Sequence, residues 1–237
     1  MHLKAIDEDL QPGQPKMQFV TRCALTLAYA FSAVALGSTS TIGNVSRVNG
    51  SVDVDQGQQA GDLSTVNGSV NVEADARAGS VETVNGSVRI ADRAAIGSAE
   101  TVNGEVLVGE GAQVEGDLET VNGSMTLHRG ARIIGHLQNV NGSMVLEGAE
   151  VRGGLETVNG DIRLQTGTRV EGGIHVEDTH NKWRGSGKKS RNPKITVERG
   201  VVLQGPLHFE REVDLYVAPG VTVPAVQGVQ PRRYALN

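Results

Sequence analysis

Aromatic residues are scarce in this chain of 237 residues, of which Phe, Tyr and Trp together make 3%. Between Phe31 and Trp183 the sequence contains none. This absence excludes a core in which large rings fill irregular space, as they do in most globular domains. The apolar residues that remain are mainly Val, Ile, Leu and Ala, and they predict a narrow and regular interior.

Cysteine is nearly absent as well. The single residue, Cys23, lies inside an apolar run, so a chain that has lost this run has no disulfide and no thiol chemistry. Its position also excludes a lipoprotein, whose acylated cysteine follows the apolar run. An excess of positive charge is missing too, since the formal net charge is -5, and we therefore expect no specific nucleic-acid partner.

The one long apolar run covers residues 23–37 and is short for a bilayer span. It follows Arg22 and ends in small residues, which is typical of a bacterial signal peptide and predicts a periplasmic, outer-surface or secreted protein. The first sixteen residues contain three acids, so Met17 is the better start, with cleavage near Ala35 to Gly37. The alternative is an uncleaved membrane anchor.

An internal repeat dominates the rest of the chain. The triplet Val-Asn-Gly occurs seven times at a nearly constant spacing. The copies begin at Val48, Val66, Val84, Val102, Val121, Val140 and Val158. Such a period indicates a stack of equivalent structural units.

A period of six residues divides each repeat. Apolar residues follow one another at Val84, Ile90, Ile96, Val102, Val108 and Val114. A second apolar residue often stands two positions earlier, as Val88 does before Ile90, which places both side chains on one face of a strand. Three short strands per repeat predict an all-β fold, a single-stranded parallel β-helix (solenoid) with triangular rungs of about 18 residues.

Two other folds compete for the same residues. The apolar spacing does not give the 3.6-residue stripe of a helix, and Val, Thr, Asn and Gly are poor helix formers. A meander of Asn-Gly hairpins is the stronger competitor. It requires two strands of similar length around each Asn-Gly, and the near identity of the copies favours parallel stacking instead.

The repeated asparagines are predicted to form a structural ladder of side-chain amides. Its members are Asn49, Asn67, Asn85, Asn103, Asn122, Asn141 and Asn159. In the copy around Asn85, Val84 and Val88 are expected in the core, Gly86 permits the bend, and Asn85 is expected to be buried. N-glycosylation is the alternative, but only five of the seven copies continue with Ser.

The repeat is interrupted after residue 178. Residues 178–194 contain six Lys or Arg and one Asp. We expect a solvated basic loop there, and the alternative is a loop that contacts an anionic surface such as an envelope polysaccharide. The candidate contact residues are Lys182, Trp183, Arg184, Lys188, Lys189 and Arg191.

These features divide the chain into four parts. Residues 1–37 form the extension and signal peptide, 38–178 the solenoid, 179–194 the basic loop, and 195–237 further rungs with a C-terminal cap. Phe209 and Tyr216 are expected to close the end of the core, because an open last rung exposes unpaired strand edges.

No constellation of catalytic residues stands out. The histidines do not repeat in register, so no metal, cofactor or catalytic residue is expected, and the protein is predicted not to be an enzyme. The histidines after the signal peptide are His128, His136, His175, His180 and His208.

Phrases such as Gly111-Ala-Gln-Val-Glu-Gly-Asp-Leu and Gly130-Ala-Arg-Ile-Ile-Gly-His-Leu resemble bactofilins, the polymer-forming bacterial cytoskeletal proteins. The phrase Glu-Thr-Val-Asn-Gly-Ser-Val is also similar to bacterial putative-adhesin repeats. The first resemblance implies a right-handed β-helix that associates end to end, although bactofilins usually work on the cytoplasmic side. The hexapeptide period resembles left-handed acyltransferase helices as well, so handedness stays open, although the right-handed form is favoured.

Taken together, the residues predict an exported, non-enzymatic structural protein that self-associates end to end as an envelope or surface scaffold. One alternative is an adhesin module that binds carbohydrate or another envelope polymer. The other is an acyltransferase of the hexapeptide type.

Overall fold

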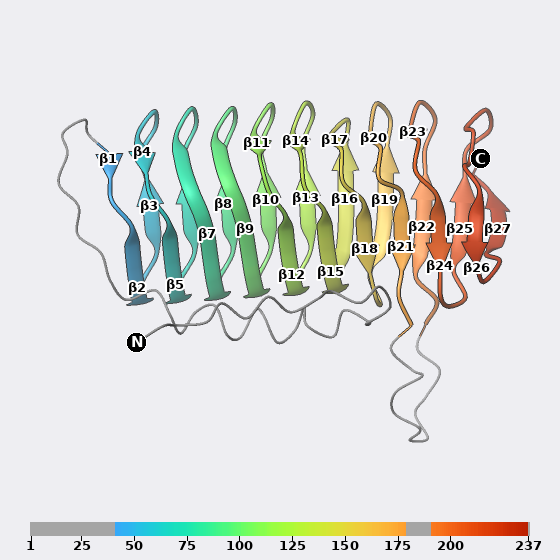
Figure 1. The fold of residues 1–237 in the computed structure, drawn as a ribbon, viewed down its shortest axis with the longest axis horizontal. Coiled ribbons are helices and arrows are strands. Elements are labelled where there is room, and N and C mark those ends of the chain that lie inside the picture. Colours follow the sequence, from blue (N-terminus) through green and yellow to red (C-terminus); the bar gives the residue numbers. More distant parts are fainter. Residues whose placement is uncertain (1–40, 179–190, 237) are drawn as a thin grey trace, which may run out of the picture. The chain divides into compact units, whose positions relative to one another are not determined.

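The computed structural model describes residues 41–178 and 191–236, and every regular element within these ranges is a β-strand (Figure 1). Consecutive strands wind through successive turns of a coil and are distributed over three faces, except in the last turn, which has strands on two of them. The predicted all-β parallel solenoid is therefore confirmed. The predicted signal peptide and residues 179–190 of the predicted basic loop lie outside the described residues.

The strands fall into three columns, one for each face of the coil. The first face contains β2 (Val45–Asn49), β5 (Leu63–Asn67), the C-terminal halves of β7 (Arg77–Asn85) and β9 (Ala95–Asn103), β12 (Leu118–Asn122), β15 (Leu137–Asn141), β18 (Leu155–Thr157), β21 (Ile174–Val176), β24 (Leu207–Phe209) and β26 (Val226–Gly228). The second face contains β3 (Val52–Val54), β6 (Val70–Val72), β8 (Val88–Ile90), β10 (Val106–Val108), β13 (Met125–Leu127), β16 (Ser143–Glu147), β19 (Asp161–Gln165), β22 (Lys194–Val197), β25 (Asp214–Val217) and β27 (Arg232–Ala235). The third face contains β1 (Thr41–Ile42), β4 (Gln59–Ala60), the N-terminal halves of β7 and β9, β11 (Gln113–Val114), β14 (Arg132–Ile133), β17 (Glu150–Val151), β20 (Arg169–Val170) and β23 (Val202–Leu203).

The long strands β7 and β9 run through a corner, so the first and third faces form one 17-stranded sheet. The second face is a separate sheet of 10 strands with one strand per turn, which gives ten described turns. Its strands pair in parallel with their equivalents one turn before and after. One turn alone exposes its backbone, and each neighbour adds a hydrogen-bonded ladder and a layer of apolar contacts.

The register between turns follows the sequence period. Val88 pairs with Val70 and Val106, its equivalents one repeat before and one repeat after. Where the sequence period breaks, Ile174 pairs with Leu207, at nearly twice the usual distance along the chain. The solenoid therefore continues past the interruption in the same register, and residues 179–190 fall in the sequence between β21 and β22 of one turn.

The core is a set of aliphatic columns. In β8, Val88 and Ile90 are buried and Arg89 between them is exposed, as expected for a strand with one inward face. The largest side chain of the core, Phe209, lies in β24 and is fully buried. It stands in register between Val176 of β21 and Gly228 of the last turn.

One predicted core position is wrong. Val84 is only half-buried, and Thr83 beside it is buried instead. The hydroxyl of Thr83 donates a 2.8 Å hydrogen bond to the backbone carbonyl of Gly68 in the preceding turn. A buried hydroxyl with such a partner loses little on leaving water, so threonine can serve as a core residue at this corner.

The glycine of the Asn85-Gly86 corner has a different purpose from the one predicted. Gly86 does not have a positive φ angle, so the bend itself does not require glycine. A Cβ atom at Gly86 would instead overlap with the carbonyl group of Gly68 one turn below. The close approach of stacked backbones therefore excludes larger residues at this corner.

Candidate functional site

The predicted asparagine ladder is present as a continuous chain of hydrogen bonds along one corner. Each side-chain amide donates to the side-chain oxygen of the asparagine one turn earlier, over distances of 3.0 to 3.2 Å from Asn67 to Asn159. The expectation that Asn85 is buried is wrong, because its side chain is exposed. These amides therefore satisfy one another at the surface.

Arg211 ends this ladder. Its guanidinium donates to the side-chain oxygen of Asn159 at 2.8 Å and to the backbone carbonyl of Val158 at 3.3 Å. It also donates to the backbone carbonyl of Arg191 at 3.3 Å. The ladder thus ends where the chain returns from the inserted segment.

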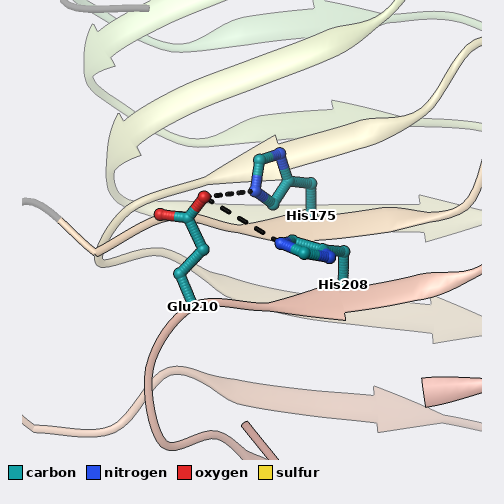
Figure 2. A group of neighbouring side chains, drawn as sticks. All are labelled: His175, His208 and Glu210. Carbon is teal, nitrogen blue, oxygen red and sulfur yellow. Dashed lines mark hydrogen bonds and ion pairs between the residues drawn. The ribbon is translucent and has the colours of Figure 1, made fainter. Parts of the chain in front are cut away.

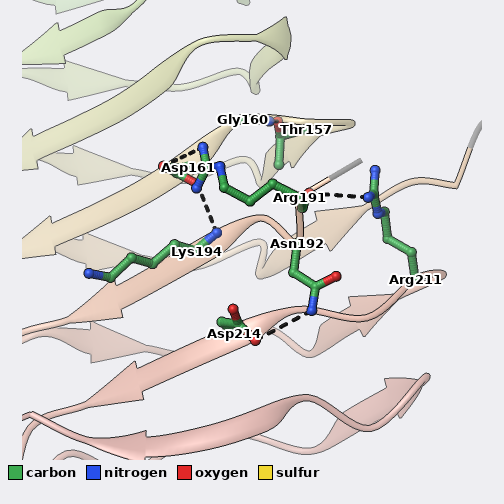
Figure 3. A network of polar contacts seen from close by, with 8 residues as sticks. All are labelled: Thr157, Gly160, Asp161, Arg191, Asn192, Lys194, Arg211 and Asp214. Atoms are coloured by element: carbon green, nitrogen blue, oxygen red, sulfur yellow. Dashed lines mark hydrogen bonds and ion pairs between the residues drawn. The ribbon is translucent and has the colours of Figure 1, made fainter. Parts of the chain in front are cut away.

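Asp161 holds residues 191–194, which we call the returning stem of the insertion (Figure 3). Its carboxylate accepts two 3.0 Å hydrogen bonds from the guanidinium of Arg191 and one of 2.8 Å from the backbone N–H of Lys194. The pKa of Arg191 is raised above its ordinary value, first by these hydrogen bonds and then by the charge of Asp161. Of the predicted anion-contact residues, Arg191 alone is described, and it serves as an anchor of the stem.

Further contacts fix the same stem from the next turns. Asn192 donates from its side-chain amide to Asp214 at 3.4 Å. The ammonium of Lys194 lies 4.5 Å from the ring centroid of Tyr216, which in turn stacks on Tyr234 with centroids 4.6 Å apart. The stem therefore contacts side chains of β25, one of which packs on β27.

Glu210 holds the outgoing stem, by which we mean the chain at Asp178, the last described residue before the insertion. One oxygen of its carboxylate accepts a 3.0 Å hydrogen bond from the backbone N–H of Asp178. The other oxygen lies 3.3 Å from Nε2 of His175 and 4.0 Å from Nε2 of His208 (Figure 2). The two carboxylates of Glu210 and Asp161 thus fix both ends of the insertion to the solenoid.

The two histidines are neighbours in register on the first face. His175 in β21 pairs with His208 in β24, and their ring centroids lie 4.9 Å apart at an interplanar angle of 76°. One ligand atom from each of His175, His208 and Glu210 lies within 4.8 Å of the others, which is a spacing that can hold a metal ion. A second such group contains Glu156, His175 and Glu177.

Sequence analysis missed this cluster because the insertion hides the register. The step from His175 to His208 is nearly twice the usual repeat, so the two histidines do not look equivalent in the sequence. Alignment of the strand patterns on either side of the insertion would have placed them in one column.

The same column is acidic in the middle of the stack. Glu82, Glu100 and Glu119 are in register on consecutive turns. Burial raises the pKa of Glu82, and the charges of Glu100 and Asp62 raise it further. One carboxylate oxygen of Glu100 is buried and has no hydrogen-bond partner within the described residues.

Comparison with known proteins gives no family model, no curated protein and no solved structure that matches this chain. In the ranges 41–178 and 191–236 there is also no helix with the length and apolar character needed to cross a membrane.

Proposed function

We propose that this chain is a non-enzymatic structural repeat protein that assembles end to end. The observation that supports the proposal is the open edge of the last turn. β26 pairs with β24 and β27 with β25, and no other described strand covers their outer edges. The unpaired N–H and C=O groups of such an edge form a template for another strand.

Exposed apolar residues accompany these edges. Val229 and Tyr234 of the last turn are 38% and 42% exposed. At the other end of the described solenoid, Ile42 is 37% exposed and Val48 is 66% exposed. Docking the last turn of one copy onto the first turn of another would continue the backbone ladder and bury these side chains.

Sedimentation velocity over a concentration series tests this proposal. The protein without its N-terminal extension should show a sedimentation coefficient that rises with concentration. Replacing Val229 and Tyr234 by Lys places charge on the open edge, which blocks pairing, and should leave a monomer. The control is Val202→Lys, which charges an equally exposed valine on β23, within the stack. A monomeric wild type, or association that survives the double substitution, would contradict the proposal.

The proposed location of this scaffold is the cell envelope or the outer surface. Support comes from the apolar run of residues 23–37 with its preceding arginine and its small C-terminal residues. Cell fractionation followed by N-terminal sequencing of the mature chain tests this location. A mature chain that begins after Ala35 agrees with it, and an intact chain in the cytoplasmic fraction would contradict it.

A second candidate function is contact between the inserted segment and an anionic envelope polymer. The observation in its favour is that Glu210 and Asp161 hold the two stems of the insertion. The predicted basic residues lie in the sequence between these two anchored stems. Replacing Trp183, Lys188 and Lys189 by Ala should abolish co-sedimentation with cell envelopes. Substitution of exposed arginines on the solenoid should leave co-sedimentation with cell envelopes unchanged. An equal loss of co-sedimentation in both variants would exclude a specific role of the insertion.

A further inference from the structure

We propose that His175, His208 and Glu210 bind a divalent transition-metal ion, with Zn²⁺ as the preferred ion. The site goes beyond the structural role proposed above, and none of its residues was expected to be a ligand. Two imidazoles and one carboxylate are a frequent ligand set for zinc, with water in the remaining position.

The distances suit such an ion. Donor atoms around a tetrahedral Zn²⁺ lie about 3.3 Å apart, given metal-to-ligand bonds of about 2.0 to 2.2 Å. Nε2 of His175 and the nearer oxygen of Glu210 already lie 3.3 Å apart. Nε2 of His208 is 4.0 Å from the same oxygen, so metal binding would require the His208 side chain to rotate toward Glu210.

The fold positions these ligands from the backbone upward. His175 and His208 pair in register on adjacent turns, and strand pairing brings their side chains together on one face. Glu210 follows two residues after His208, and its backbone N–H donates a 2.9 Å hydrogen bond to the carbonyl of Val176. The N–H of Asp178 binds the second oxygen of Glu210, an outer interaction of the kind that orients metal ligands.

The surroundings favour a cation. Glu156 and Glu177 each offer a carboxylate oxygen near a ring nitrogen of His175, within the same 4.8 Å limit. Three carboxylates thus gather around two imidazoles on one face of the solenoid. Imidazole ligands favour Zn²⁺, Cu²⁺ or Ni²⁺, whereas Ca²⁺ and Mg²⁺ prefer sites built from oxygen alone.

A bound ion would have a structural consequence. It would join β21 to β24, which precede and follow residues 179–190 in the sequence, and Glu210 would connect it to the outgoing stem at Asp178. The metal would therefore stabilise the two turns that carry the insertion. Because it binds the folded state, it should raise the melting temperature of the protein.

Isothermal titration of the full chain with ZnCl₂ tests the proposal, with MgCl₂ as the comparison ion. We expect one Zn²⁺ per chain, and at least about 10-fold weaker binding for His208→Ala and for Glu210→Gln, since even the loss of an outer partner costs this much. His128→Ala is the matched control, because His128 faces the single carboxylate of Glu147 at 2.9 Å. It should bind Zn²⁺ like the wild type.

A second measurement separates loss of the site from loss of the fold. Zn²⁺ should raise the melting temperature of the wild type and of His128→Ala, and it should not change that of His208→Ala, whose circular dichroism should match the wild type. Three results would overturn the proposal: no Zn²⁺ binding to the wild type, unchanged binding in His208→Ala, or an equal loss in His128→Ala. Binding that depends on His180 and survives His208→Ala would also overturn it, because the ligand set would be wrong.

Discussion

Replacement of Asn139 by Thr should stabilise the solenoid. Asn139 is 3% exposed, and both polar atoms of its amide are buried without a hydrogen-bond partner in the described part of the chain. It pairs in register with Thr120 and Thr157, in a column where every other buried polar residue is threonine. Asn139 therefore interrupts a column of threonines whose hydroxyl groups form hydrogen bonds with backbone groups.

The size of the effect follows from the neighbouring turns. Thr101 donates to the carbonyl of Gly86 at 3.0 Å and Thr120 to that of Gly104 at 3.3 Å. By the same register, a threonine at position 139 would donate to the carbonyl of Gly123. Removal of an unsatisfied buried amide is worth about 1 to 3 kcal/mol and a new hydrogen bond about 1 kcal/mol. Some contacts of the longer amide are lost, so we expect a net gain of about 2 kcal/mol.

Calorimetry and urea unfolding measure this gain. A gain of this size corresponds to a rise in melting temperature of about 4 to 8 °C for a chain of this length. The matched control is Thr101→Asn, which places the same amide in an equivalent site and should destabilise the protein by a similar amount. A neutral or destabilising Asn139→Thr would refute the reasoning, because it would show that the amide is satisfied in the folded protein.

Three further predictions concern single residues. Because burial raises the pKa of Glu82, the folded state binds its proton more tightly than the unfolded state. Its contribution to stability is present at low pH and lost as the pH rises through the raised pKa, so Glu82→Gln should raise the melting temperature at pH 7 more than at pH 4. Gly86→Ala should destabilise the solenoid by about 2 kcal/mol or more in urea unfolding, because the new methyl group overlaps with a carbonyl one turn below, whereas Gly43→Ala meets no neighbouring atom and should be nearly neutral. Asp161→Asn should speed proteolysis within residues 179–190, while Asp75→Asn, which breaks a similar bidentate arginine pair elsewhere, should not.

The solenoid could be predicted from sequence because stacking imposes the same requirement on every turn. Positions such as Val88 and Val106 lie above one another, so the period of the sequence is also the period of the structure. The inward position of Thr83 could not be predicted from apolar spacing, because the hydroxyl becomes acceptable only through the carbonyl of the preceding turn.

The candidate site was harder to predict, since it depends on contacts across the insertion. His175 and His208 are neighbours only because the chain resumes its register after the inserted segment. Glu210 and Asp161 likewise act on stems that are distant in sequence. The period of the repeats gives no information about such pairs.

Electron microscopy of the protein without its N-terminal extension tests the central proposal, end-to-end assembly, most directly. If the ten described turns stack on those of the next copy at about 4.8 Å per turn, each subunit adds about 48 Å along a filament. We predict filaments with this axial repeat at high protein concentration. Isolated particles at every concentration, or filaments with an unrelated repeat, would contradict the proposal.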